Sequence, residues 1–154
     1  MKKILVFFGM ICILGCSTTS EKPQSMQPNK SLNQDNKQVT VIVNVFYDEE
    51  VTKVKEFIQK EQAPLLFNIE DSGIVRFEWY LNEDENTGTL IEVFENANAF
   101  QSLGSKIIGS PINIKFNELF AIESLTVLGE VSDDFKSKLQ PMNPKFRFYS
   151  GGIN

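Results

Sequence analysis

The chain has 154 residues, including thirteen phenylalanines and two cysteines, and it has no histidine. Without histidine there can be no Ser-His-Asp or Cys-His triad and no metal or haem site that needs an imidazole ligand. The net charge of −5 and the lack of a basic patch argue against a nucleic-acid partner. We therefore expect neither a metal nor a cofactor, and any acid–base chemistry would fall to Asp, Glu, Lys or Tyr.

The first sixteen residues have the pattern of a bacterial sorting signal. Lys2 and Lys3 precede the apolar stretch from Ile4 to Leu14, which is too short to serve as a membrane-spanning helix. The stretch runs into Leu14-Gly15-Cys16, which resembles the lipobox of bacterial lipoproteins. An ordinary secretory signal with a chance cysteine is the alternative interpretation.

The lipobox resemblance implies that residues 1–15 are a signal peptide and that Cys16 receives the lipid. The lipid would anchor the protein in the cell membrane. Ser17 implies the outer membrane if the cell is Gram-negative, because an aspartate there would retain a lipoprotein in the inner membrane.

The segment after the cysteine has the composition of a spacer. Residues 17–38 are rich in Pro, Ser, Gln and Asn, and only Met26 and Leu32 are apolar. Such a segment cannot bury enough apolar surface to fold. We expect residues 16–38 to form the lipidated cysteine and a disordered tether, and residues 39–154 to form one domain.

The first half of the domain alternates between strand and helix patterns. A β-branched run over 39–47 predicts a strand, and Asp48 is expected to cap the helix that follows. Pro64 is expected to interrupt or restart this helix. A second strand is predicted over 74–81, followed by a polar hairpin loop and a third strand over 89–95.

The second half repeats the helix and strand order. Asn96 is a good N-cap for a helix near 97–107, and Pro111 starts another helix at its first position. A fourth strand is predicted over 122–131. Ser132 is expected to cap a short helix, and a short fifth strand is predicted over 146–150.

The predicted order defines the fold class as α+β. It is β-α-β-β-α-β, the ferredoxin-like order with an antiparallel sheet, plus a short C-terminal α-β extension. Helices would cover one face of the sheet. The strands are apolar on both sides, with Val41 and Val43 on one face of the first strand and Ile42 and Phe46 on the other. A homodimer packed sheet to sheet is therefore expected.

Several segments resemble the antibiotic biosynthesis monooxygenase family. SGIVRFEWYL at 72–81 resembles the family's E-P-G-x-L-x-Y-E-W-F stretch, and LIEVFENANA at 90–99 resembles E-x-Y-x-D-S-x-A. VLGEVS at 127–132 is similar to a v-x-G-x-x-S element, and Gly151-Gly152 matches a terminal glycine pair. The resemblance covers residues 40 to 152 and implies a dimeric α+β barrel.

The chain departs from the family at functional positions. Leu103 stands where many relatives have histidine, Asn96 replaces the motif aspartate and Phe94 replaces the motif tyrosine. Haem degradation as in some relatives is therefore not expected. Cofactor-independent oxygenation is still compatible with the sequence, because an oxidisable substrate can supply its own carbanion while the protein orients it and stabilises charge.

Two polar residues in apolar strands are the candidate catalytic groups. Asn44 could bind a carbonyl or oxyanion, or it could be a structural amide whose hydrogen bonds are satisfied. Glu92 could be a general base with a raised pKa. A cross-strand ion pair of Glu92 with Arg76 or with a lysine is the alternative for that carboxylate, and we favour it.

Aromatic residues are the candidate walls of a substrate pocket, although they could equally be core residues. Five aromatic residues are assigned to the pocket in this interpretation: Trp79, Phe94, Phe100, Phe116 and Phe120. The sequence thus supports two functions. One is a lipid-anchored, cofactor-independent monooxygenase that acts on a quinol or small aromatic. The other is a non-catalytic dimeric lipoprotein that binds a small apolar ligand or has a structural role.

Overall fold

The computed structural model describes residues 31–153. The predictions for the signal peptide (1–15) and for lipid on Cys16 lie outside these residues. No helix among residues 31–153 has the length and apolar character needed to cross a membrane.

A five-stranded sheet forms the centre of the domain, with the strand order β3-β4-β2-β5-β6. Its strands are β2 (Val39–Phe46), β3 (Ile74–Asn82), β4 (Thr87–Phe94), β5 (Ala121–Leu128) and β6 (Lys145–Arg147). The pairs β3–β4, β4–β2 and β2–β5 are antiparallel, and β6 is parallel to β5. The ferredoxin-like α+β fold is confirmed, because the helical connections from β2 to β3 and from β4 to β5 each join two parallel strands that flank a third.

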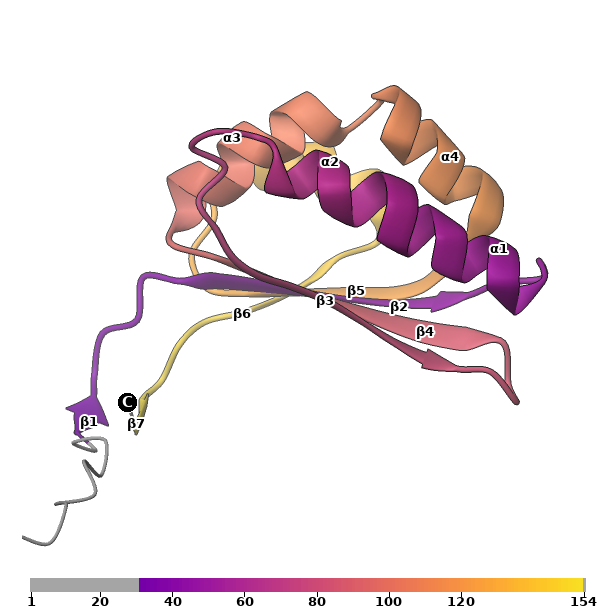
Figure 1. The fold of residues 1–154 in the computed structure, drawn as a ribbon. Helices are drawn as coiled ribbons and strands as arrows, with labels where there is room; N and C mark the ends of the chain where they lie inside the picture. The colour runs from indigo at the N-terminus through magenta and orange to yellow at the C-terminus, as the bar shows by residue number, and fades with distance from the viewer. Residues whose placement is uncertain (1–30, 154) are drawn as a thin grey trace, which may run out of the picture. The chain divides into compact units, whose positions relative to one another are not determined.

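The helices lie on one face of this sheet (Figure 1). They are α1 (Val51–Glu56), α2 (Ala63–Phe67), α3 (Ala97–Ile107), α4 (Pro111–Leu119) and α5 (Asp133–Leu139), with a 3-10 turn at Gln140–Met142. Between α1 and α2, residues Phe57–Gln62 form a π-helical segment. Pro64 lies at the start of α2, so the chain continues as a helix through the predicted interruption.

Capping follows the sequence in two places and departs from it in a third. The Asn96 side chain accepts a hydrogen bond from the Ala99 amide at 3.0 Å, and Ser132 accepts one from Phe135 at 3.3 Å. These bonds satisfy amides that the first helical turn leaves free. The prediction for Asp48 was wrong, because α1 begins after Glu50 and has no side-chain cap.

The end of the segment expected to be a tether contains a short strand. β1 (Leu32–Asn33) pairs antiparallel with β7 (Gly152–Ile153), and the Tyr149 hydroxyl donates to the Asn33 carbonyl at 2.9 Å. This pairing depends on the far end of the chain, so the local composition of residues 17–38 does not indicate it.

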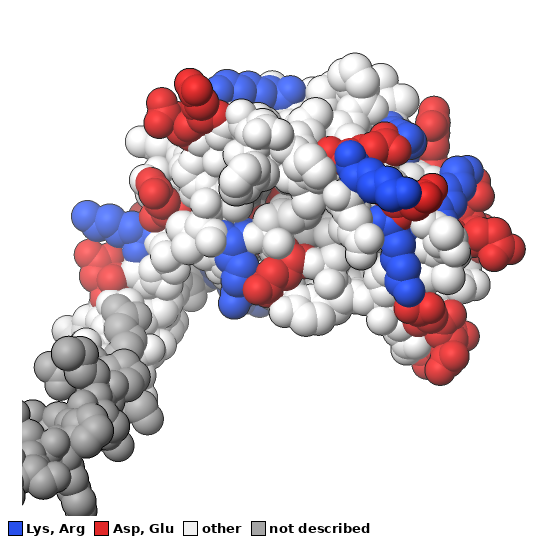
Figure 2. Space-filling model, in the orientation of Figure 1, with Lys and Arg blue, Asp and Glu red and all other residues white. Residues whose placement is uncertain are grey.

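The core lies between the helices and the sheet. Val39, Val41, Val43 and Val45 of β2 are buried, and the residues between them are half-buried. The alternation places one set of side chains under the helices and the other on the opposite face of the sheet. Charged side chains are interspersed in sign on the surface shown in Figure 2.

Candidate functional site

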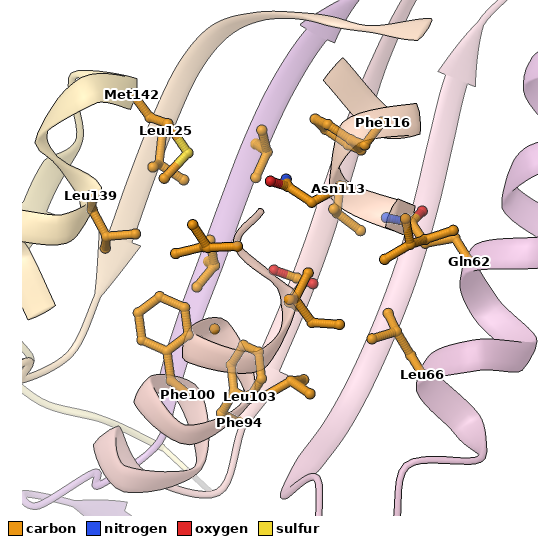
Figure 3. A pocket seen from close by; sticks show the side chains of 18 of the residues that line it. Gln62, Leu66, Phe94, Phe100, Leu103, Asn113, Phe116, Leu125, Leu139 and Met142 are labelled. Carbon is orange, nitrogen blue, oxygen red and sulfur yellow. The ribbon is translucent and has the colours of Figure 1, made fainter. Parts of the chain in front are cut away.

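A cavity of about 140 Å³ lies between the helices and the sheet. Figure 3 shows it from close by, with side chains from both layers around it. Val43 and Leu90 contribute to its floor on the sheet, and Leu66, Leu103 and Phe116 contribute to its helical side. A dry, apolar cavity of roughly this size holds a single benzene-sized ring.

The cavity reaches the surface at the connection between α3 and α4. Ile108, in this connection, is 44% exposed, whereas Val41 and Leu125 at the sheet are almost fully buried. Asn113, half-buried near this opening, accepts a hydrogen bond from the Gly109 amide at 2.9 Å. The cavity lining therefore runs from the α3–α4 connection to the sheet.

Glu92 is the carboxylate that lines the cavity. The strand register places Glu92 opposite Val41 of β2 on one side and Phe77 of β3 on the other. Among residues 31–153, the Glu92 side chain makes no hydrogen bond and no ion pair. Burial alone raises the pKa of Glu92 to about 7, since the surrounding protein desolvates the charged form.

The expected ion pair between Arg76 and Glu92 is absent, so that prediction was wrong. Arg76 lies opposite Val93, the neighbour of Glu92, and its Nε atom is 3.5 Å from Oε2 of Glu78. Successive residues of a strand face opposite sides of the sheet. Arg76 and Glu92 are therefore on different faces.

Asn44 and Glu92 are not brought together. Asn44 follows Val43, which lines the cavity, and its side chain lies on the opposite face of the sheet. There its Oδ1 accepts a hydrogen bond from Thr89 at 2.7 Å, and its Nδ2 donates one to Ser124 at 2.9 Å. The geometry corresponds to the structural alternative, an amide whose hydrogen bonds are satisfied.

Three of the five aromatic residues assigned to the pocket line the cavity: Phe94, Phe100 and Phe116. The other two, Trp79 and Phe120, stack on each other beside it, with ring centroids 5.0 Å apart. The ring centroids of Trp79 and Phe116 are 6.1 Å apart, so Trp79 packs against a residue that lines the cavity.

Two further residues have a place in the cavity. Leu103, at the position where the resemblance gives many relatives a histidine, is buried and lines the cavity. Gln62, which is not among the predicted site residues, also lines it. A signal was present, because Gln62 lies four residues after Ile58 and four before Leu66 and so interrupts the apolar face of the helix.

No metal site accompanies the cavity in the described part of the chain, where no group of three or more Cys, Asp or Glu residues could hold an ion. The arrangement suits a small planar molecule with an acidic proton. Glu92 can accept that proton, and the apolar walls exclude water from the reacting atoms.

Comparison with known proteins identifies solved structures that share the fold. No protein-family model matches the chain, and no curated protein matches it in sequence. The structure of MupZ from Pseudomonas fluorescens is similar, with a TM-score of 0.58 and 19% identity over 76% of this chain and 88% of that one. SnoaB from Streptomyces nogalater, a cofactor-independent oxygenase, matches with a TM-score of 0.51 and 16% identity over 61% of this chain and 93% of its own. At these identities the likeness shows a shared fold.

Proposed function

We propose that the domain binds a single-ring quinol or hydroxyarene in the cavity and oxygenates it without a cofactor, with Glu92 as the general base. The observation that carries the proposal is the unpaired Glu92 carboxyl on the floor of an apolar cavity. Its raised pKa of about 7 matches what a base needs near neutral pH. The similarity of fold to SnoaB supports the reaction class by analogy only.

The proposed reaction balances with dioxygen as the oxidant. Glu92 takes the hydroxyl proton, and the negative charge spreads to a ring carbon. That carbon reduces dioxygen and bonds to it, and the peroxide takes the proton back from Glu92. Loss of the ring hydrogen as a proton, together with cleavage of the O–O bond, releases water and leaves a quinone carbonyl. A quinol and one dioxygen thus give a hydroxyquinone and one water.

A non-catalytic ligand-binding protein is the second candidate. Two observations favour it: Asn44 lies on the far face of the sheet, and an aliphatic side chain, Leu103, fills the position that is histidine in many relatives of the family it resembles. In this case the same cavity binds a small aromatic molecule and leaves it unchanged.

Oxygen uptake by the purified protein separates the two candidates. With a panel of single-ring quinols and catechols, we expect uptake above the rate of autoxidation, and Glu92→Gln should lower it at least about a hundredfold, the usual share of a general base. Glu118→Gln, on the exposed side of α4, is the matched control. Binding without uptake would select the second candidate, and equal uptake by Glu92→Gln would remove Glu92 from the mechanism.

We also propose that two copies pack through the face of the sheet that the helices leave uncovered. Ile42 and Ile91 lie opposite each other there, half-buried, with Phe46 on the same face. Light scattering should give a dimer, and Ile42→Glu should give a monomer. Ile114→Glu, at an exposed position on α4, should remain dimeric.

Finally, we propose that lipid on Cys16 anchors the protein, in the outer membrane if the cell has one. The support is the sequence Leu14-Gly15-Cys16 behind a basic and apolar leader. Labelled palmitate should enter the protein and should not enter Cys16→Ser. Labelling of that variant would contradict the anchor.

A further inference from the structure

The contact between Trp79 and Gln62 fixes the orientation of a buried amide. The Nε1 atom of Trp79 donates a hydrogen bond to Oε1 of Gln62 at 3.0 Å. An indole N–H is a donor only, so the oxygen of the amide must face Trp79. The amide nitrogen of Gln62 must then point the other way.

That nitrogen is a donor without a protein partner. Gln62 is 9% exposed, and the bond from Trp79 is the one hydrogen bond that its side chain makes among residues 31–153. Gln62 lines the cavity, and Figure 3 shows its nitrogen on the cavity side. This nitrogen is not sealed from the cavity. A bound molecule or a water molecule in the cavity can therefore accept its hydrogen bond.

The helix is distorted at this place. Gln62 is the last residue of the π-helical segment Phe57–Gln62, and π-helical turns inside α-helices are frequent at functional sites. The wider turn changes the angle at which the following residues leave the helix axis. Gln62 lies on the helical side of the cavity, at the end of this distorted segment.

We propose that Nε2 of Gln62 donates a hydrogen bond to an oxygen on the aromatic ring of the ligand, and that Trp79 acts as its positioning residue. The cavity therefore selects oxygen-bearing rings over hydrocarbon rings of the same size. This inference rests on the proposed function for the class of ligand, but it concerns binding and not turnover. If the reaction occurs, the same donor stabilises the phenolate oxygen that forms when Glu92 takes the proton.

Phenol and toluene test the proposal, because toluene has a methyl group where phenol has a hydroxyl. We expect Gln62→Leu to weaken the binding of phenol relative to toluene by about tenfold, which is the value of one buried hydrogen bond. Calorimetry without oxygen measures the ratio of the two dissociation constants. Gln59→Leu is the matched control, since Gln59 lies in the same π-helical segment with its side chain exposed. It should keep the ratio of the unmodified protein.

A second variant separates the donor from the packing of the amide. Gln62→Glu keeps an acceptor for Trp79 and loses the N–H₂ donor. It should therefore weaken the binding of anisole, whose oxygen can only accept a hydrogen bond, relative to ethylbenzene. An unchanged ratio in Gln62→Leu, or no binding of either ring by the unmodified protein, would overturn the proposal. Absence of oxygen uptake would overturn the proposed oxygenation alone, because the binding ratio does not depend on turnover.

Discussion

Asn44 and Thr89 are joined across β2 and β4 by a hydrogen bond of 2.7 Å from the Thr89 hydroxyl to the Asn44 Oδ1 atom. On its other side, Asn44 donates to the hydroxyl of Ser124 on β5 at 2.9 Å. One side chain therefore connects the three central strands of the sheet. The connection lies on the face away from the cavity, so its role is structural.

Replacement of Asn44 by alanine should lower stability without changing ligand binding. The hydroxyls of Thr89 and Ser124 lose a partner in a half-buried place, so the free energy of unfolding should fall by about 1–3 kcal/mol. Urea denaturation measures this loss, and Asn98→Ala, at an exposed position of α3, is the control. A fall in affinity for phenol would show instead that Asn44 takes part in the site.

Glu92 should make stability depend on pH between its unfolded and folded pKa values. The folded pKa of about 7 exceeds the ordinary value of 4.5, so the folded state binds the proton more tightly. The contribution of Glu92 to the free energy of unfolding is therefore fully present below about pH 4.5. It is lost as the pH rises through 7, and the loss is at most about 3 kcal/mol. Denaturation at pH 5 and pH 8 measures the loss.

The variant Glu92→Gln should remove most of this pH dependence and should be the more stable protein at pH 8. Glu118→Gln, with the same change at an exposed position, should follow the unmodified protein. A pH dependence that survives in Glu92→Gln would show that another group causes it.

Gly104 of α3 leaves space for the ring of Phe135. A Cβ atom at Gly104 would lie 2.6 Å from Cζ of Phe135, which is buried and packs edge-on against Phe100. Gly104→Ala should therefore destabilise the protein by about 1–3 kcal/mol, although alanine favours helices. In a Phe135→Leu background, the smaller side chain leaves room for the Cβ atom, so Gly104→Ala should lower the stability less. A double-mutant cycle of thermal unfolding measures this difference. A stabilising Gly104→Ala would contradict the packing.

The buried hydroxyl of Tyr47 has no hydrogen-bond partner among the described residues. Burial raises the pKa of Tyr47, so the hydroxyl stays neutral, but its lost hydration is not replaced. Tyr47→Phe should therefore raise the free energy of unfolding by about 1 kcal/mol. Tyr80→Phe, at an exposed position, is the comparison and should change little. A destabilised Tyr47→Phe would show that the hydroxyl has a partner in solution.

The fold could be predicted from the sequence because its signals are local. The alternation of buried valines in β2 has the period of a strand, and Asn96 and Ser132 satisfy amides of their own helices. The order of these elements then restricts the topology to a few arrangements. The pairing of Leu32–Asn33 with Gly152–Ile153 could not be predicted in this way, because two-residue strands have no periodicity.

The site was predictable only in part. Glu92 stands out as a carboxylate in an apolar strand, but whether Arg76 neutralises it depends on the register between β3 and β4. A shift of one residue in the register places a side chain on the other face of the sheet. The same dependence on the face of the sheet separates Asn44 from the cavity, and the bond between Trp79 and Gln62 joins two elements whose contact no local pattern encodes.

The class of fold, the positions of the main helices and strands, and the exclusion of histidine chemistry all follow from the amino-acid sequence alone. Periodicity, capping residues and composition are properties of neighbouring residues, so they can be read along the chain. The packing of distant elements places Glu92 and Gln62 at one cavity, whose lining among residues 31–153 has no Lys or Arg. Those properties depend on which side chains from distant elements share one low-dielectric space, and it is this space that raises the pKa of Glu92.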